Sequence, residues 1–315
     1  MEAASSRTAP VRATHARIGR LDDPSCFYTF RMRKALIAIA FLLGLAATLA
    51  AVSFAAGEDP PASGPVTSLA QLRGVNFVSH CAFSHRAPDD PIVYPGRPGA
   101  SHDHTFLGSK ATDAYSTSAS LRAAASTCKR RGETAAYWVP TLAVGGQAVV
   151  PAAASVYYRR GTIDDVKPFP FGFRMIAGSA AATTPQPLSV TRWDCGIEAN
   201  VPGASDAPVC PPGPRTALRL HVSFPECWDG QNLDSIDHHS HTAYAVEGRC
   251  PPSHPVALPA IELILRYPET KGPVVLSSGS IYSAHADFVN SWEEGRLEGL
   301  VTDCLNELRF CGGGG

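Results

Sequence analysis

Residues 218–224 read Leu218-Arg219-Leu220-His221-Val222-Ser223-Phe224, which alternates apolar and polar side chains without a break. A period of two is typical of a β-strand with one buried face. The pattern recurs at 261–267, and shorter strands are predicted at 137–142, 155–159, 171–176 and 274–277. The chain is therefore predicted to be mainly β, an antiparallel sandwich or jelly roll with long loops.

Two helices are predicted beside these strands. Apolar residues at helical spacing indicate a short helix near 118–131, followed by Gly132 where a C-terminal glycine is expected. A longer apolar stripe predicts a C-terminal helix near 296–309 that packs on the sheet. The chain has 27 prolines and 27 glycines, which exclude long helices nearly everywhere else.

The N-terminal region predicts export. An apolar run at 35–56 follows Arg31, Arg33 and Lys34, so residues 32–56 are expected to be a signal peptide or a membrane anchor. We expect Met32 to be the true start and 1–31 to be a non-structural upstream segment. A linker at 57–68, a single secreted β-rich domain at 69–311 and a disordered tail at 312–315 would follow. The predicted location is extracellular or at the cell surface.

The cysteines support the same location. Without Cys26, which precedes Met32, eight of the nine cysteines remain, and an even number in an exported chain indicates four disulfides. The eight are Cys81, Cys128, Cys195, Cys210, Cys227, Cys250, Cys304 and Cys311. Spacing does not determine the pairing, although Cys227–Cys250 and Cys304–Cys311 are favoured as near neighbours.

The charge of the chain bears on its partners. The formal net charge is −1, and the part after residue 56 is mildly acidic. We see no Lys/Arg cluster there, so nucleic acid is not expected as a partner. Membrane contact is expected only through the N-terminal segment, if that segment is not cleaved.

Three short doublets carry the functional prediction: His102-Asp103-His104, His239-Ser240-His241 and His285-Ala286-Asp287. On an extended strand, side chains two residues apart point to the same face. If the three faces converge, they form a metal site or an acid/base site. Purely structural polar networks are the alternative interpretation.

Each candidate residue has a predicted role. His102, His104, His241 and His85 would bind a metal or ligand, and zinc or copper suits imidazole ligands. His285 with Asp287 would form a catalytic base pair, with His239 as a further catalytic residue. Asp89, Asp90 and Asp229 are weaker candidates because they lie beside Pro or Gly in turn-like contexts.

Aromatic residues suggest a different function. Trp228, Trp292 and Tyr137 could stack on sugar rings, although core packing is the common role of such side chains. The chain contains no Gly-x-Ser-x-Gly, P-loop or dinucleotide fingerprint, so nothing supports hydride or phosphoryl transfer.

Several ordered motifs resemble one known family. They are Ser101–Gly108, Tyr137–Leu142, Phe171–Gly178, Phe224–Tyr244, Cys250-Pro251 with His254-Pro255, and His285–Asn290. Together they resemble the secreted domain-of-unknown-function family number nineteen-ninety-six, found in bacterial and fungal extracellular proteins. The resemblance implies export, one domain and a carbohydrate or cell-surface setting, and it supplies no catalytic residues.

The sequence thus leads to one expectation and two alternatives. The expected function is hydrolysis of cell-wall or environmental polysaccharide at a His/Asp cleft. The first alternative is a non-catalytic carbohydrate-binding or cell-surface protein. The second is a metal-binding protein without enzymatic activity.

Overall fold

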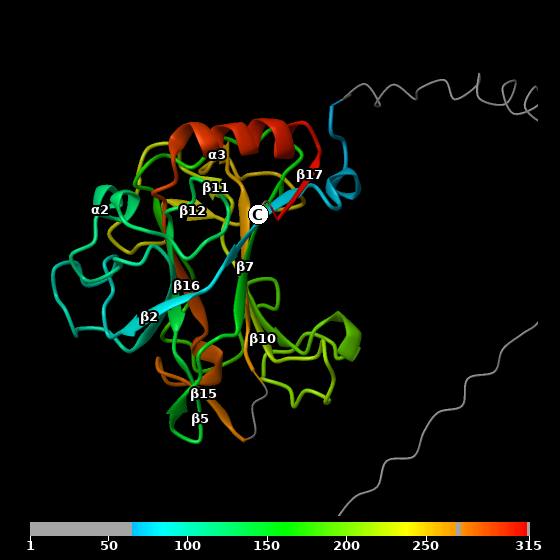
Figure 1. Cartoon of the computed structure of the whole chain (residues 1–315). Helices are drawn as coiled ribbons and strands as arrows, with labels where there is room; N and C mark the ends of the chain where they lie inside the picture. Colours follow the sequence, from blue (N-terminus) through cyan, green and yellow to red (C-terminus); the bar gives the residue numbers. More distant parts are fainter. Residues whose placement is uncertain (1–64, 269–271, 314–315) are drawn as a thin grey trace, which may run out of the picture. The chain divides into compact units, whose positions relative to one another are not determined.

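Two large sheets form the framework of the computed structural model, which describes residues 65–268 and 272–313 (Figure 1). The six-stranded sheet runs in the order β17 (Phe310–Gly313), β1 (Asn76–Cys81), β7 (Ala153–Arg159), β14 (Ala260–Arg266), β10 (Arg219–Ser223), β9 (Thr191–Asp194). The five-stranded sheet runs in the order β2 (Phe83–Ala87), β3 (His104–Gly108), β4 (Ala136–Pro140), β16 (His285–Val289), β8 (Arg174–Gly178). All neighbours are antiparallel except β1 and β17.

The alternation of each strand explains how these sheets pack. Leu220 and Val222 of β10 belong to the same buried cluster as Ala286 and Phe288 of β16. This cluster fills the space between the two sheets, because apolar side chains from both inner faces meet there. The prediction of a mainly β, antiparallel sandwich is confirmed.

Smaller elements complete the fold. Two three-stranded sheets contain β12 (Thr242–Ala243), β11 (Cys227–Trp228), β13 (Val256–Ala257) and β15 (Val274–Leu276), β5 (Leu142–Val144), β6 (Gln147–Ala148). Short 3-10 turns lie at Leu69–Leu72, Ile197–Ala199 and Ile281–Ser283. Helix α2 spans Ser118–Ala123, and α3 spans Glu294–Leu300 and continues as a π-helical segment, Val301–Asn306.

The helix predicted at 118–131 is wrong beyond Ala123. Residues 125–128 instead extend alongside strands, because the Thr127 N–H donates to the Gly108 carbonyl at 2.8 Å and the Lys110 N–H donates to the Ala125 carbonyl at 2.8 Å. The predicted C-terminal helix is confirmed with shifted bounds. Its buried stripe consists of Leu297, Val301, Cys304 and Leu305.

All eight predicted cysteines form disulfides. The pairs are Cys81–Cys128, Cys195–Cys210, Cys227–Cys250 and Cys304–Cys311. Both near-neighbour pairings were predicted and are confirmed. Four disulfides are typical of a protein that folds in an oxidising compartment.

The predictions for the two ends of the chain can be compared with the structure only in part. The predicted upstream, signal or anchor segments at 1–56 lie outside the described residues, as does the linker up to Gly64. Among the described residues, no helix has the length and apolar character needed to cross a membrane. The tail prediction is wrong for Gly312 and Gly313, because β17 pairs with β1 as far as Gly313.

Candidate metal centre

The outer face of the five-stranded sheet, opposite the core, carries the candidate site. Since Ala286 and Phe288 of β16 point into the core, His285 and Asp287 point outward, to the same side as His104 of β3. A second buried apolar cluster lies on this outer face, formed by side chains of the strands together with Ile92 and Leu121 from outside the sheet. The cluster consists of Ile92, Phe106, Leu121, Ala136, Trp138, Ile176 and Val289.

Three imidazoles converge on this face. The ring centroid of His102 lies 4.2 Å from that of His104 and 5.1 Å from that of His285. One ring nitrogen from each histidine lies within 4.8 Å of the others. Two of the three doublets therefore meet, so the convergence that the sequence left open holds for His102, His104 and His285.

Backbone carbonyls hold two of these rings. Nδ1 of His104 lies 2.9 Å from the Asp89 carbonyl oxygen, and Nδ1 of His285 lies 2.8 Å from the Ser283 carbonyl oxygen. A carbonyl can only accept, so each Nδ1 donates its hydrogen and each Nε2 carries the free lone pair of a neutral ring. Metal-binding histidines are oriented in this way by a partner on their second nitrogen.

The facing polar atoms have no partners within the described structure. Nε2 of His102, Nε2 of His104 and both carboxylate oxygens of Asp287 are buried without a hydrogen bond. Nε2 of His285 lies 3.8 Å from Oδ2 of Asp287. Buried polar atoms without partners are costly, and a cation held among them would remove that cost.

Burial also sets the ionisation of these groups. It lowers the pKa of His102, lowers that of His104 well below its usual range and lowers that of His285 to about 4. Burial, and then the nearby Asp90 charge, raises the pKa of Asp287 well above its usual range. The three imidazoles are thus neutral at pH 7, which is the form that binds a metal.

The donor set fits a divalent transition metal. With Zn–N bonds near 2.0 Å, nitrogens of a tetrahedral zinc site lie about 3.3 Å apart. The three ring nitrogens all lie within 4.8 Å of one another, which is close to that spacing. Three imidazoles beside one carboxylate suit zinc or copper rather than calcium.

A cavity of about 310 Å³ opens next to the three imidazoles. Its lining includes His102, His285 and Asp287, together with His239 and Tyr94. His239 comes from the second doublet and lines the same cavity as His285, and partial desolvation lowers its pKa. The predicted catalytic residues His285, Asp287 and His239 therefore share one cavity.

The loop that presents His239 is organised by Asp237. Its Oδ1 accepts hydrogen bonds from the backbone N–H groups of His239 at 3.1 Å and Ser240 at 2.9 Å. The Ser235 hydroxyl donates to the same oxygen at 2.7 Å. These bonds hold the pKa of Asp237 well below its usual range. They also stabilise a turn, so residues 237–241 are not a strand.

His241 does not join the site. Because its doublet lies on a turn, two-residue spacing does not bring His241 to the same side as His239. Nε2 of His241 lies 2.7 Å from the Arg174 carbonyl oxygen, and Nδ1 lies 2.9 Å from the Ser235 hydroxyl. Both nitrogens are used, so the predicted ligand role of His241 is not compatible with the structure.

His85 is also separate from the three imidazoles. Its ring stacks on Phe106 with centroids 4.8 Å apart. Its nitrogens contact the Thr112 carbonyl at 2.7 Å and the Ser84 hydroxyl at 2.9 Å. The prediction that His85 binds the same ligand is wrong, since it is saturated with other partners.

The predicted sugar-stacking residues do not form a surface row. Tyr137 and Trp292 are 0% exposed and lie in the core, so that role is excluded for both. Trp228 is half-buried, and its indole N–H donates to the Asn232 carbonyl at 2.6 Å. Only Trp228 among the three retains an accessible surface.

Other cavity residues were missed or ranked low from sequence. Tyr94 and His238 both line the cavity, although no sequence pattern identifies them as candidates. Asp90 also lines it, while its Oδ1 accepts from the Ile92 and Val93 N–H groups at 2.9 Å, as its turn context indicated. The Asp-Asp-Pro turn was the available signal for this loop.

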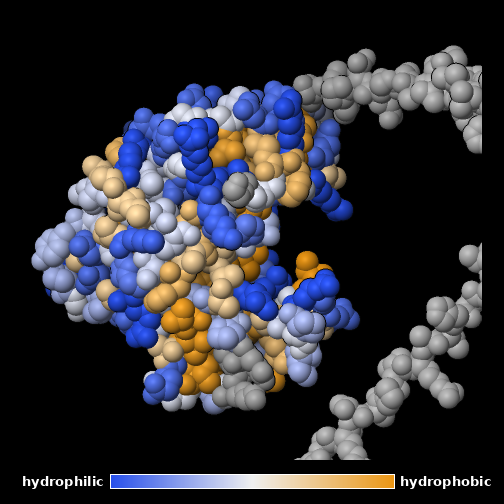
Figure 2. All heavy atoms as spheres, in the orientation of Figure 1, coloured by the Kyte–Doolittle hydropathy of each residue, from blue (hydrophilic) through white to orange (hydrophobic). Residues whose placement is uncertain are grey.

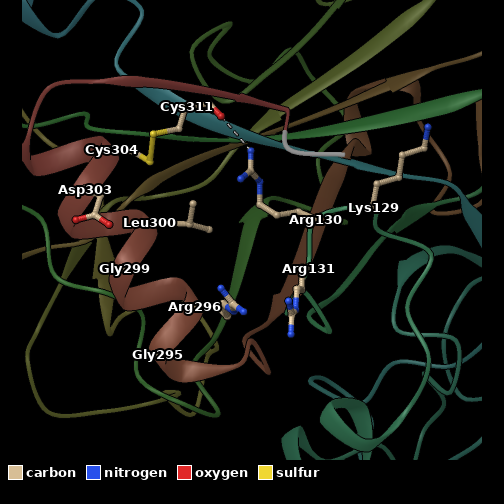
Figure 3. A pocket seen from close by; sticks show the side chains of 10 residues that line it. All are labelled: Lys129, Arg130, Arg131, Gly295, Arg296, Gly299, Leu300, Asp303, Cys304 and Cys311. Carbon is tan, nitrogen blue, oxygen red and sulfur yellow. Dashed lines mark hydrogen bonds between the residues drawn. A yellow bond between two sulfur atoms is a disulfide. The ribbon is translucent and has the colours of Figure 1, made fainter.

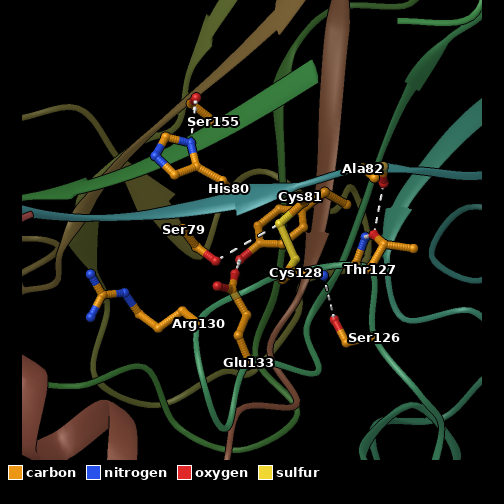
Figure 4. The surroundings of a disulfide bond; sticks show 12 residues. Ser79, His80, Cys81, Ala82, Ser126, Thr127, Cys128, Arg130, Glu133 and Ser155 are labelled. Atoms are coloured by element: carbon orange, nitrogen blue, oxygen red, sulfur yellow. Dashed lines mark hydrogen bonds between the residues drawn. A yellow bond between two sulfur atoms is a disulfide. The ribbon is translucent and has the colours of Figure 1, made fainter. Parts of the chain in front are cut away.

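A second group of ligand-type residues is not a metal site. Cys81, Cys128 and Glu133 lie close together, but the two sulfurs form a disulfide (Figure 4). Glu133 instead accepts a hydrogen bond from the Tyr137 hydroxyl, which contacts the Tyr158 hydroxyl. This buried network belongs to the core.

Comparison with known proteins identifies the family. The family model described as "Domain of unknown function (DUF1996)" matches residues 90–292, which is more than half of the chain, so the protein belongs to this family. The matched range includes all three imidazoles, Asp287 and His239. No curated protein and no solved structure shows a significant match.

Proposed function

We propose that this protein is an exported, metal-dependent hydrolase with zinc as the first candidate metal. One observation carries the proposal: His102, His104 and His285 converge beside a cavity, with two rings anchored through Nδ1 and two Nε2 atoms lacking partners. Three protein ligands leave a coordination position for water or substrate, which is typical of catalytic rather than structural zinc.

The roles follow from position in the cavity. His102, His104 and His285 would hold the ion, which supplies Lewis-acid chemistry and activates water. Burial favours the protonated Asp287 carboxyl, but a cation bound beside it would favour its ionised form. Asp287, whose Oδ2 lies 3.8 Å from Nε2 of His285, would then balance the charge of the ion and accept a proton from water. His239, which also lines the cavity, would return a proton to the leaving group.

The substrate class is proposed from setting and polarity. Four disulfides favour an oxidising compartment, and the cavity lining includes several polar and charged side chains. An extracellular polysaccharide is therefore the first substrate class to test. Tyr94 is an aromatic residue at the cavity that could contact a sugar ring.

Calorimetric titration with ZnCl₂ and CuCl₂ tests the metal centre. The wild type should bind one ion, and His102→Ala and His104→Ala should each abolish binding. His80→Ala is the matched control, because this exposed imidazole contacts Ser155 and belongs to β1, in the six-stranded sheet rather than the sheet that carries His104 and His285. Equal binding by wild type and His102→Ala would remove the proposed centre.

Release of reducing ends from xylan, chitosan and polygalacturonate tests the reaction. We expect release by the zinc-loaded wild type and loss of release in Asp287→Asn and His239→Ala, both of which should still bind zinc. Stoichiometric zinc without release from any of these polymers would favour the alternative of a metal-binding protein without enzymatic activity.

A further inference from the structure

A groove of about 460 Å³ lies at the other end of β16, between α3 and the loop that follows Cys128. Figure 3 shows Arg130 and Arg131 on one side of this groove, and Arg296 and Leu300 on the helix side. Lys129 also lines it. The run Lys129-Arg130-Arg131 is a basic cluster, so the sequence-based expectation of a surface without one is wrong.

The groove concentrates positive charge on a chain whose formal net charge is −1. Four cations line it against one acid, Asp303. Lys129, Arg131 and Arg296 are exposed and form no ion pair within the part of the chain that the structure describes. Their charges are therefore available to a ligand.

The fourth cation is fixed in place. Nε of Arg130 donates to the Val78 carbonyl at 2.9 Å, and its guanidinium lies 5.5 Å from the centre of the Phe77 ring. A second guanidinium nitrogen donates to the Gly312 carbonyl. An anchored guanidinium loses little freedom when an anion binds, which favours recognition of carboxylate or sulfate.

We propose that this groove binds an anionic polysaccharide through its carboxylate or sulfate groups. The charge suits any oxyanion polymer, but the lining has no aromatic side chain on which nucleic acid bases could stack. On the helix side, Cβ atoms added at Gly295 and Gly299 would meet nothing within 4 Å, so the groove has open space for a chain. The binding surface is separate from the candidate metal centre and does not depend on it.

The test measures binding of the full secreted chain to dextran sulfate and polygalacturonate, with neutral dextran and polyphosphate as comparisons. We expect the sulfated and carboxylated polymers to bind, and affinity to fall as NaCl rises. Replacing Lys129, Arg131 and Arg296 by Ala should reduce affinity about tenfold, as expected for three exposed ion pairs.

Two further variants make the result specific. Gly299→Glu adds a carboxylate where a side chain has room, so it should weaken binding while the protein stays folded. The matched control replaces three exposed cations outside the groove, Arg73, Lys110 and Lys167, and should keep wild-type affinity. Equal losses in both triple variants, binding to neutral dextran, or tighter binding to polyphosphate would each overturn the proposal.

Discussion

The imidazole rings of His104 and His285 lie with their centroids 5.7 Å apart, although they come from β3 and β16, which both flank β4. Their side chains converge over β4, where His104 is opposite Pro140. A metal bound between them would link β3 and β16 across β4. Because a ligand that binds only the folded state stabilises it, zinc at a hundredfold excess over its Kd should add about 2.7 kcal/mol to the free energy of unfolding.

Thermal unfolding with and without zinc checks this first prediction. Chelation should reverse the zinc-induced rise in Tm, and His102→Ala should show no rise. His80→Ala should respond as the wild type does. A zinc-induced rise that persists in His102→Ala would place the ion elsewhere.

A second prediction concerns Gly178, which pairs with His285 at the edge of the site. A Cβ at Gly178 would lie 2.6 Å from the Ala284 carbonyl oxygen, and its φ of +80° disfavours any other residue. Gly178→Ala should therefore displace the start of β16, destabilise the fold by about 1–3 kcal/mol and weaken zinc binding about tenfold.

The control variant Gly145→Ala separates the effect of backbone strain at a positive φ from the effect of displacing β16. Gly145 also has a positive φ, of +57°, but a Cβ there would meet nothing within 4 Å. This variant should lose some stability in urea unfolding and keep wild-type zinc affinity. Equal zinc affinity in the two variants would mean that the approach of Gly178 to His285 does not position the imidazole.

The strands and the local part of the site could be predicted from sequence. Alternation in 218–224 identified β10 because one face of that strand is buried in the core. His102 and His104 were predicted together because two-residue spacing at the start of a strand places both side chains on one face, and β3 begins at His104. Convergence with His285 depends on the strand order of the sheet, which local patterns do not encode.

The failures have physical causes of the same kind. His239 and His241 separate because Asp237 stabilises a turn, so the spacing rule for strands did not apply. Trp292 was predicted to stack on sugar rings, but it is buried in the core and its indole N–H donates to the Tyr158 hydroxyl at 2.9 Å. Residues 124–128 have helical spacing, but this segment instead forms strand-like backbone hydrogen bonds with β3 and the residues next to it.

A third prediction concerns acid stability and Glu262, on the outer face of the six-stranded sheet. Figure 2 shows the surface hollowed beside β7 and β10. Burial opposes ionisation of Glu262, but a hydrogen bond with His221 and the charges of Arg159 and Arg192 outweigh it and lower its pKa to about 2. An unfolded glutamate titrates near 4.5.

The sign follows from these two values. As the pH falls below 4.5, the unfolded chain takes up a proton at Glu262 before the folded chain does. The contribution of Glu262 to the free energy of unfolding is therefore complete above pH 4.5 and is lost towards pH 2. The loss is on the order of 3 kcal/mol. The stability difference between wild type and Glu262→Gln in urea should shrink over this range. A constant difference would contradict the role of Glu262, and exposed Glu298→Gln serves as the control.

Glu133 gives a fourth prediction with the opposite sign. Burial raises its pKa to about 7, against hydrogen bonds from Ser79 and Tyr137 and the charge of Arg130 (Figure 4). As pH rises from 4.5 to 7, the unfolded chain loses this proton first, so wild-type stability falls by on the order of 3 kcal/mol. Glu133→Gln keeps an acceptor for the Tyr137 hydroxyl. Between pH 5 and pH 8, its free energy of unfolding in urea should rise relative to that of the wild type. No relative gain would mean that Glu133 ionises normally.

The fifth prediction compares the loss of the disulfide that closes the segment carrying His239 with the loss of a disulfide elsewhere. Cys227–Cys250 closes the segment that carries His239, whereas Cys195–Cys210 closes a loop outside the cavity lining. Replacing either pair by serine should cost about 3 kcal/mol, since the closed loops have comparable lengths. Only loss of Cys227–Cys250 should lower kcat/KM for polysaccharide hydrolysis, because it frees the loop that presents His239.

Zinc stoichiometry should stay at one in both variants, as His102, His104 and His285 lie outside both loops. A matching loss of hydrolysis in the Cys195–Cys210 variant would assign the effect to general instability rather than to His239.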